Sequence, residues 1–301
     1  MDSKEKNFVS AIIYVRNCKS RVRDFLKTVI DVFEKNFEHS EIICVNDGST
    51  DDSLEVIRET SSLASCTSIS VVNMSFFHGL ELSMNAGMDL AIGDFVFEFD
   101  NTILDFDSDQ IMNVYRKSLE GNDIVAASVD QKERLSSRLF YHLFARFSNL
   151  KHRMNTESFR ILSRRAINRV NSMSKSIPYR KALYANCGLK TDRIVYARKA
   201  QFGEGKIIQD KNYRKDLAVD SLIMFTDIGF RFSLGMTTLM MVFLLCTIVY
   251  SIVVFLISTP ISGWTSTMLF LSVVFLGLFG ILTVIIKYLQ ILVDLIFRRK
   301  R

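Results

Sequence analysis

The sequence predicts an α/β domain with a mainly parallel, helix-covered sheet, followed by two transmembrane helices. Apolar runs rich in β-branched residues alternate with segments of helical spacing through the first third of the chain. This alternation is typical of a parallel sheet whose crossovers are helices. No charged residue occurs from Ser233 to Ile257 or from Ile261 to Ile286. Each of these runs exceeds the roughly 20 residues that cross a hydrocarbon core.

Four strands are expected in the N-terminal part, because four short runs are rich in apolar, β-branched or aromatic residues. They are residues 9–15, 41–45, 68–72 and 95–99. Helices are expected between them, where apolar residues recur at intervals of three and four. They are residues 21–37, a segment through Leu54 and Ile57, and residues 79–91.

Two of the predicted strands end in acidic residues. The strand over 41–45 leads into Asn46 and Asp47, and the strand over 95–99 leads into Asp100. Ligands of parallel sheets bind at the carboxyl ends of the strands, so both carboxylates are expected at one edge. One can hydrogen-bond a base or ribose, and the other can hold a hard divalent cation. A glycine-rich phosphate loop is absent from the sequence, so a cation bridging a pyrophosphate is the expected alternative.

The net charge of +6 is compatible with nucleic acid or with an anionic membrane surface. No basic run with interleaved aromatic residues fits a nucleic-acid-reading module, so we expect no nucleic acid partner. Attraction of basic residues to anionic lipids explains the charge more simply. The five cysteines are scattered and form no C-x-x-C pair, which indicates reduced structural thiols rather than a zinc site.

The flanks of the two apolar runs predict their orientation in the cell membrane. Arg231 precedes the first run, and Lys287 with the basic residues 298–301 follows the second. Positive flanks remain in the cytoplasm, so both termini are expected there, with the loop that contains Trp264 outside. The polar start, residues 1–7, does not resemble a signal peptide, so the large N-terminal part is expected to be cytoplasmic too.

Six ordered motifs give the chain a family resemblance. They are Val45-Asn46-Asp47-Gly48-Ser49-Thr50-Asp51, the segment 85–94, Ser137-Arg138-Leu139-Phe140-Tyr141, Ser158-Phe159-Arg160-Ile161-Leu162, Tyr196-Ala197-Arg198 with Gly203-Glu204-Gly205-Lys206, and the segment 218–226. With these motifs the chain resembles glycosyltransferase family 2, in the polyisoprenyl-phosphate branch that is similar to dolichyl-phosphate mannose synthases.

The resemblance implies a GT-A-like fold and transfer of a sugar from a nucleotide-diphosphate sugar to a polyprenyl phosphate, with inversion at the anomeric carbon. The acceptor is already nucleophilic, because the second pKa of a phosphate monoester is ~6. The partners of this protein would then be a nucleotide sugar, a polyprenyl phosphate lipid and the membrane. The expected cofactor is Mg²⁺ or Mn²⁺, which would stabilise the leaving diphosphate.

The resemblance also implies roles for individual residues. Asn17, Asn46, Asp47 and Asp100 match positions that bind the nucleotide. Asp100 and Thr102 match the metal motif, and Asp100 and Ser158 match catalytic positions. The residues expected to contact the acceptor phosphate or the diphosphate are Arg134, Ser137, Arg138, Arg160, Arg198 and Lys206.

Several positions depart from the family pattern, and two of these departures fall on the metal and base motifs. The metal motif D-x-D is Asp100-Asn101-Thr102, and the aspartate of D-F-R-L-L is Ser158. Asp105, Asp107 and Asp109 lie near enough in sequence to substitute, but an acidic helix start is the favoured interpretation. Two functions therefore stay open: an active enzyme, which we favour, or a catalytically weakened relative. Such a relative would act as a membrane partner or scaffold for an active transferase or a lipid-sugar flippase.

Three regions are expected along the chain. Residues 1–133 form the nucleotide-sugar-binding core, residues 134–230 the acceptor-side and interfacial region, and residues 231–301 the membrane anchor with its basic tail. Within the middle region, the basic segment 134–154 has the spacing of an amphipathic interfacial helix, although packing on the domain's own core explains the pattern almost as well.

Gly277 and Gly280 are small residues of the kind through which membrane helices associate, so a homo-oligomer is compatible with the sequence.

Overall fold

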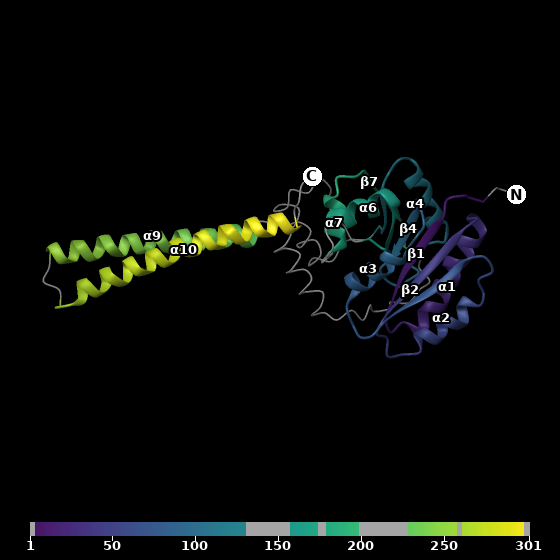
Figure 1. Ribbon diagram of the computed structural model, residues 1–301, viewed down its shortest axis with the longest axis horizontal. Helices are drawn as coiled ribbons and strands as arrows, with labels where there is room; N and C mark the ends of the chain where they lie inside the picture. The colour runs from purple at the N-terminus through teal and green to yellow at the C-terminus, as the bar shows by residue number, and fades with distance from the viewer. Residues whose placement is uncertain (1–3, 131–156, 174–178, 199–227, 258–260, 298–301) are drawn as a thin grey trace. The chain divides into compact units, whose positions relative to one another are not determined.

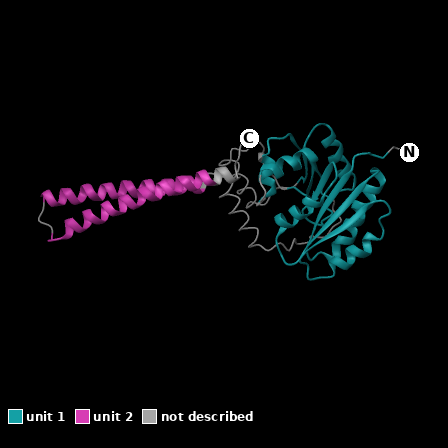
Figure 2. Cartoon of the chain, in the orientation of Figure 1, with its two compact units in different colours: residues 1–221 teal, residues 222–301 magenta. Residues whose placement is uncertain are grey.

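The computed structural model describes residues 4–130, 157–173, 179–198, 228–257 and 261–297. The chain divides into two compact units, Met1–Ser221 and Leu222–Arg301 (Figure 2). The predicted boundary at residue 134 falls outside the described residues, and the three-part division stays a prediction.

The first unit alternates strands and helices, as the sequence predicts (Figure 1). Its strands are β1 (Val9–Val15), β2 (Ser40–Asp47), β3 (Ser68–Met74), β4 (Phe95–Phe99), β5 (Ile124–Val129), β6 (Phe159–Ser163) and β7 (Thr191–Tyr196). Its helices are α1 (Lys19–Asn36), α2 (Ser53–Ser61), α3 (Leu80–Leu90), α4 (Asp109–Leu119), α6 (Arg164–Met173) and α7 (Arg180–Asn186).

The seven strands form one sheet in the order β3-β2-β1-β4-β6-β5-β7. Strands β1 to β4 pair in parallel, and β5 pairs in parallel with β7. Strand β6 runs antiparallel to both of its neighbours, β4 and β5. The prediction of a mainly parallel, helix-covered sheet is therefore confirmed, and all four predicted strands are present.

Side chains on alternate positions of the strands face two different helix layers. On one face, Ile13 of β1, Phe97 and Phe99 of β4 pack with Phe25 and Phe33 of α1 in the main buried core. Glu98 and Asp100 project to the opposite face, because they lie one residue out of phase with Phe97 and Phe99. Because of this direction, Glu98 and Asp100 are available for polar contacts on the face opposite the aromatic core.

Helix α3 lies close against β1 and β2 through Gly87. A Cβ atom on this residue would stand 2.5 Å from Ile12 Cγ2 and 2.8 Å from Val45 Cγ2. A glycine is therefore required where the helix meets the two strands. This close contact fixes α3 beside the carboxyl ends of β1 and β2, where the functional side chains gather.

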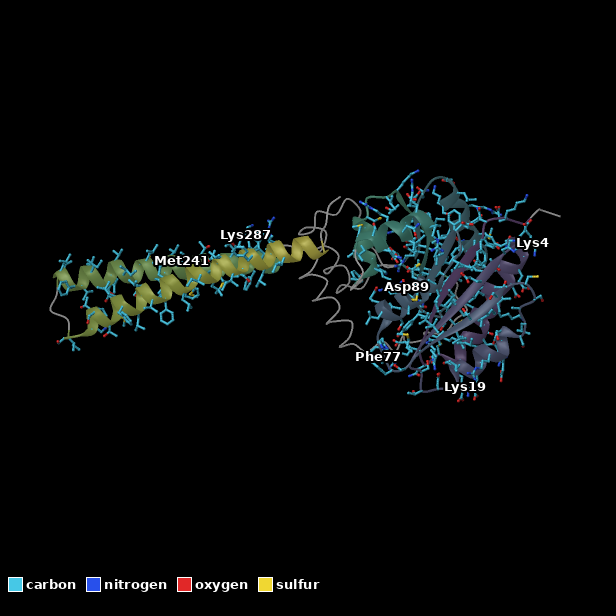
Figure 3. The ribbon with its side chains drawn as sticks, viewed as in Figure 1. Lys4, Lys19, Phe77, Asp89, Met241 and Lys287 are labelled. Atoms are coloured by element: carbon cyan, nitrogen blue, oxygen red, sulfur yellow. The ribbon has the colours of Figure 1, made fainter. Side chains whose placement is uncertain are left out.

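The second unit consists of α9 (Ile228–Ile257) and α10 (Trp264–Phe297). Within them Gly229–Ile257 and Trp264–Leu292, 29 residues each, are long and apolar enough to cross a membrane. Figure 3 shows their surface of carbon-rich side chains, with Lys287 as a labelled exception near one end. The two predicted apolar helices are thus present, and the predicted amphipathic segment 134–154 lies outside the described residues.

Candidate active site

The carboxyl ends of β2 and β4 meet at one edge of the sheet, on either side of β1. All three strands are parallel, and Asp47 is the last residue of β2 while Asp100 directly follows β4. The sequence-based prediction that these carboxylates share one edge is therefore confirmed by the strand order.

Asp47 is fully buried and is held by neutral donors. The Tyr14 hydroxyl donates to its Oδ2 at 2.8 Å. The backbone N–H groups of His78 and Gly79 donate at 2.7 Å to Oδ1 and at 3.0 Å to Oδ2. The carboxylate therefore joins β2 to β1 and to the turn that begins α3, and its hydrogen bonds hold these three segments together at this edge of the sheet.

Asn46 and Asn17 lie around the same turn. Asn46 Nδ2 donates to Asn73 Oδ1 at 2.6 Å, which joins β2 to β3. Asn17 has a positive φ of 45° and accepts the Thr50 N–H on its Oδ1 at 2.8 Å. Of these two predicted nucleotide-binding residues, Asn46 thus lies in β2 next to Asp47, and Asn17 lies on the loop after β1.

Arg16 covers part of this edge. Its Nη1 donates to the Asp47 carbonyl oxygen at 2.6 Å, and its guanidinium carbon lies 3.9 Å from the centre of the Phe77 ring. A guanidinium above an aromatic face is an attractive contact. The pair links the loop after β1 to the loop after β3, beside Asp47.

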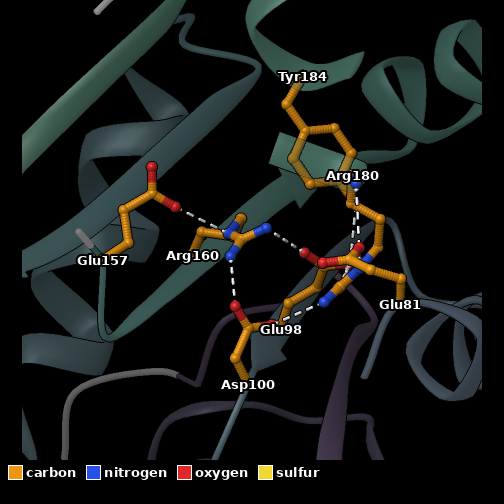
Figure 4. A network of polar contacts seen from close by, with 7 residues as sticks. All are labelled: Glu81, Glu98, Asp100, Glu157, Arg160, Arg180 and Tyr184. Atoms are coloured by element: carbon orange, nitrogen blue, oxygen red, sulfur yellow. Dashed lines mark hydrogen bonds and ion pairs between the residues drawn. The ribbon is translucent and has the colours of Figure 1, made fainter. Parts of the chain in front are cut away.

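Asp100 contacts two buried guanidiniums instead of neutral donors (Figure 4). Arg160 Nη2 donates to its Oδ2 at 2.7 Å, and Arg180 Nη2 donates to its Oδ1 at 2.8 Å. The same two arginines also bind Glu98, through Arg160 Nη1 at 3.1 Å and Arg180 Nη1 at 2.7 Å. Glu98 and Arg160 are direct partners across β4 and β6, so strand register creates half of this network.

The outer sides of both guanidiniums face further carboxylates. Arg180 Nε donates to Glu81 Oε2 of α3 at 2.9 Å. Arg160 Nε lies 3.0 Å from Glu157 Oε2, within ion-pair distance but not aligned for a hydrogen bond. The Tyr184 hydroxyl of α7 donates to Glu98 Oε1 at 2.8 Å. The network therefore joins α3, α7, β4 and β6 around Asp100.

The electrostatics of the network follow from burial and pairing. Burial alone would raise the pKa of Asp100, but the charges of Arg160 and Arg180 outweigh it and hold that pKa well below its usual range. Burial and the neighbouring Glu98 carboxylate raise the pKa of the Tyr184 hydroxyl. Asp100 is therefore an ionised carboxylate at neutral pH, and Tyr184 is a neutral donor.

The residues around Asp100 do not fit a divalent cation. Both oxygens of Asp100 already accept from guanidiniums, and Thr102 is uncharged and buried, with its hydroxyl beside the Cys18 thiol. Among the residues that the structure describes, no group of three or more His, Cys, Asp or Glu side chains is placed to hold a metal ion. Hard cations of this class require several oxygen ligands, which this arrangement does not offer.

Ser158 directly precedes β6, on the side where the antiparallel pairing of Phe99 with Phe159 leads toward Asp100. Its hydroxyl donates to Asp105 Oδ2 at 3.4 Å, and the Tyr196 hydroxyl donates to Asp105 Oδ1 at 3.2 Å. Burial raises the pKa of Asp105. This residue precedes α4 by four positions and turns inward, so treating it as part of an acidic helix start was wrong.

The predicted phosphate-binding residues divide into three groups. Arg160 is only 1% exposed and is fully engaged with carboxylates, so direct contact with a lipid phosphate does not follow from this arrangement. Arg198 is exposed, and its charge acts on Asp105 and Tyr196. Arg134, Ser137, Arg138 and Lys206 lie outside the described residues.

Sequence reasoning missed Glu98, Arg180, Glu81, Glu157 and Tyr184. One signal was available for Glu98, since a charged residue inside the apolar run Phe95–Phe99 must find a partner when the strand is buried. No motif marked Arg180 as its partner, because the two residues meet only through the packing of α7 on the sheet.

Comparison with known proteins gives a family and a fold. Residues 10–183 match the sequence profile described as Glycosyl transferase family 2. The chain is 27% identical over 227 residues to an uncharacterized glycosyltransferase of Synechocystis sp., with 72% of this chain and 69% of the relative covered. It is 30% identical over 201 residues to a prophage bactoprenol glucosyl transferase homolog of Escherichia coli, with 63% of each chain covered.

One solved structure with a similar fold is glucosyl-3-phosphoglycerate synthase from Mycobacterium tuberculosis, in complex with Mn²⁺, UDP-glucose and phosphoglyceric acid. The TM-score is 0.51 at 12% identity, and the match covers 73% of this chain and 78% of the other. At this identity the likeness concerns the fold, and it agrees with the predicted GT-A-like architecture.

Proposed function

Because the chain belongs to glycosyl transferase family 2, we propose that it moves a sugar from a nucleotide-diphosphate sugar to a polyprenyl phosphate at the cytoplasmic membrane face. Glycosyltransferase activity itself follows from the family match and from the relatives. The acceptor is the finer part of the proposal. It rests on the 30% identity to a bactoprenol glucosyl transferase homolog, since bactoprenol is a polyprenyl alcohol.

The nucleoside would bind at the end of β2, where Asn17, Asn46 and Asp47 border one turn. The sugar diphosphate would then extend toward the end of β4, where Asp100 lies. This assignment is supported by the order of the parallel strands, which brings both ends to one edge. Arg198 is an exposed cation beside the Ser158 and Asp105 pair, and is therefore suited to an acceptor phosphate. The predicted phosphate contacts of Arg134, Ser137, Arg138 and Lys206 remain part of the proposal.

In the proposed reaction an oxygen of the acceptor phosphate forms a bond to the anomeric carbon. The bond from that carbon to the donor diphosphate breaks, its electron pair leaves with the nucleoside diphosphate, and the configuration inverts. A phosphate monoester with a second pKa of ~6 is mostly ionised at neutral pH, so no carboxylate base is needed to remove a proton. A serine at position 158, in place of the family's aspartate, is compatible with this chemistry.

The expected Mg²⁺ or Mn²⁺ is the part of the proposal that the geometry supports least. A divalent cation would stabilise the departing diphosphate. The donor set around Asp100 and Thr102 does not fit one, so no step of the reaction is assigned to it.

Helices α9 and α10 are proposed to anchor the enzyme in the cell membrane, with both termini in the cytoplasm. Their length and composition support a crossing of the bilayer, and the basic flanks Arg231 and Lys287 support the orientation. An anchored enzyme would meet a membrane-confined lipid acceptor at the headgroup layer.

A partner or scaffold role remains the second candidate. The observation that favours it is the closed state of Asp100, whose two oxygens are already bound by arginines. The predicted homo-oligomer and flippase partner have no further support.

The test is a transfer assay with purified, detergent-solubilised full-length protein, a polyprenyl phosphate and a panel of UDP-, GDP- and dTDP-sugars. We expect one donor to give a lipid-linked sugar phosphate, and we expect the product to disappear in Asp100→Ala. A folded Asp100→Ala protein, checked by circular dichroism, makes that loss interpretable. No product with any donor, together with no thermal shift on adding the nucleotides, would favour the scaffold role.

A further inference from the structure

Both carboxylate oxygens of Asp100, the residue at the first position of the metal motif, already accept hydrogen bonds from guanidiniums. Its Oδ1 and Oδ2 accept from Arg180 and Arg160 at 2.8 and 2.7 Å. A cation bound to either oxygen would lie within a few ångströms of two fixed positive charges. Like charges at such distances repel strongly, and more strongly where water is excluded. Binding of a cation therefore requires at least one guanidinium to move.

The guanidiniums are held against such a movement from several sides. Arg180 also binds Glu81 at 2.9 Å and Glu98 at 2.7 Å. Arg160 also contacts Glu98 at 3.1 Å and Glu157 at 3.0 Å. Both arginine side chains are 1% exposed, so water cannot replace the lost contacts. Displacing either one leaves a buried charge without its partner, which is the costly case for buried ion pairs.

Two of the four carboxylates in the network are matched by its two guanidiniums, and one divalent cation would give these two carboxylates the same balance. Glu98 and Asp100 contribute two negative charges on one face of β4, and Arg160 and Arg180 contribute two positive charges (Figure 4). Two carboxylates and one divalent cation would give the same sum. Glu81 and Glu157 lie outside this quartet, at the Nε atoms, and Lys181 acts on Asp100 with a further positive charge.

The second position of the metal motif offers no compensation. Thr102 is 3% exposed, and its hydroxyl lies beside the Cys18 thiol. A neutral hydroxyl adds no charge that could offset the two arginines. The one carboxylate of the motif, Asp100, is thus bound by arginines, and the second carboxylate of a D-x-D motif is absent.

We propose that Arg160 and Arg180 take the place of a divalent cation at this edge of the sheet, so that the chain binds its nucleotide-sugar donor without Mg²⁺ or Mn²⁺. The inference rests on the proposed function, because it concerns the same donor. Asp100 then acts as a positioning residue, which holds the two guanidiniums rather than a metal.

Two binding measurements on the full chain in detergent micelles test the proposal. Electron paramagnetic resonance measures how much added Mn²⁺ the protein binds without nucleotide, in the wild type and in Asp100→Asn. Asp109→Asn is the matched control, because it removes the same charge from an exposed residue nearby in sequence. Titration calorimetry measures the affinity for UDP-glucose, UDP-N-acetylglucosamine and GDP-mannose, each with EDTA and again with Mn²⁺.

We expect the same Mn²⁺ binding in all three proteins, and one donor whose affinity in EDTA stays within about threefold of its value in Mn²⁺, a difference below ~1 kcal/mol. Mn²⁺ bound by the wild type and by Asp109→Asn but lost in an Asp100→Asn protein that circular dichroism shows to be folded would overturn the proposal. A loss of donor affinity of about tenfold or more in EDTA would overturn it as well and leave sugar transfer intact. Failure of all three donors to bind under either condition would count against the proposed function and this inference together.

Discussion

The ends of β2 and β4 present the same residue type at the same edge of the sheet, but they hold it in different ways. Asp47 accepts from a tyrosine hydroxyl and two backbone N–H groups, all of them neutral. Asp100 accepts from two guanidiniums that are themselves shared with Glu98. Neutral donors shape a turn, whereas buried charges that depend on one another fix a network. The β2 end is therefore organised by neutral hydrogen bonds, and the β4 end by the balance of buried charges.

The largest effect is expected from removing the charge at the β4 end. Asp100→Asn should lower the free energy of unfolding by about 3–5 kcal/mol, because it leaves two buried guanidiniums short of a carboxylate. Urea denaturation of the solubilised chain, followed by circular dichroism, measures this change. Asp109→Asn should change stability by less than about 0.5 kcal/mol, since this residue is exposed. A loss below about 1 kcal/mol for Asp100→Asn would mean that the network does not hold the fold together.

A smaller effect is expected at the β2 end. Asp47→Asn should cost about 1–3 kcal/mol, because an amide group would replace one acceptor in front of buried N–H donors. The same denaturation experiment measures it, and the neutral side chain should cost less here than at Asp100. An equal or greater loss for Asp47→Asn would remove the distinction between the two strand ends.

The pH dependence of stability should separate Asp105 from Asp100. The pKa of Asp105 is raised above 3.8, so the folded state binds its proton more tightly than the unfolded state does. As pH rises from 3.8 through the raised pKa, ionisation of Asp105 should lower the stability of the wild type relative to Asp105→Asn. The pKa of Asp100 is lowered, so its contribution is present above pH 3.8 and is lost as pH falls below it.

The free energy of unfolding of wild type and Asp105→Asn, measured between pH 3 and pH 8, tests the direction of this pH dependence. Groups that face Asp105 are Ser158, Tyr196 and Arg198, and none of them is changed in this comparison. The advantage of Asp105→Asn should grow with pH and then level off. A variant that becomes less stable relative to wild type as pH rises would show that the ionised carboxylate is favoured instead.

The smallest effect is expected at Ser158. Its hydrogen bond to Asp105 is long, at 3.4 Å, so Ser158→Ala should cost only about 0.5 kcal/mol. The proposed chemistry needs no base at this position, so transfer by Ser158→Ala should stay close to that of the wild type. A large loss of transfer by a stable Ser158→Ala protein would show that this hydroxyl takes part in the reaction.

Much of the fold was predictable because local patterns specify it. The runs at 9–15 and 95–99 carry apolar side chains through buried strands, and the structure has both at those positions. The two apolar helices followed from length and composition alone. Strands β5, β6 and β7 were not predicted, although β5 is a buried run. Strand β7 is largely exposed, which leaves less pattern to detect.

The site was predictable only where a strand end determines position. Asp47 and Asp100 could be placed at one edge because parallel strands end together. The partners of Asp100 could not be identified, because Arg160 and Arg180 lie 60 and 80 positions away along the chain. The contact between an arginine and Asp100 depends on tertiary packing, and a local sequence motif contains no information about tertiary packing. Asp105 was misread for the same reason, since its inward turn toward Ser158 is a tertiary contact.

The most direct test of the proposed donor site is a density map of the full chain with its donor nucleotide bound. We expect the nucleoside beside Asn46 and Asp47 at the end of β2, with the diphosphate reaching toward Asp100 at the end of β4. A nucleotide bound away from these two strand ends would contradict the assignment of this edge as the donor site.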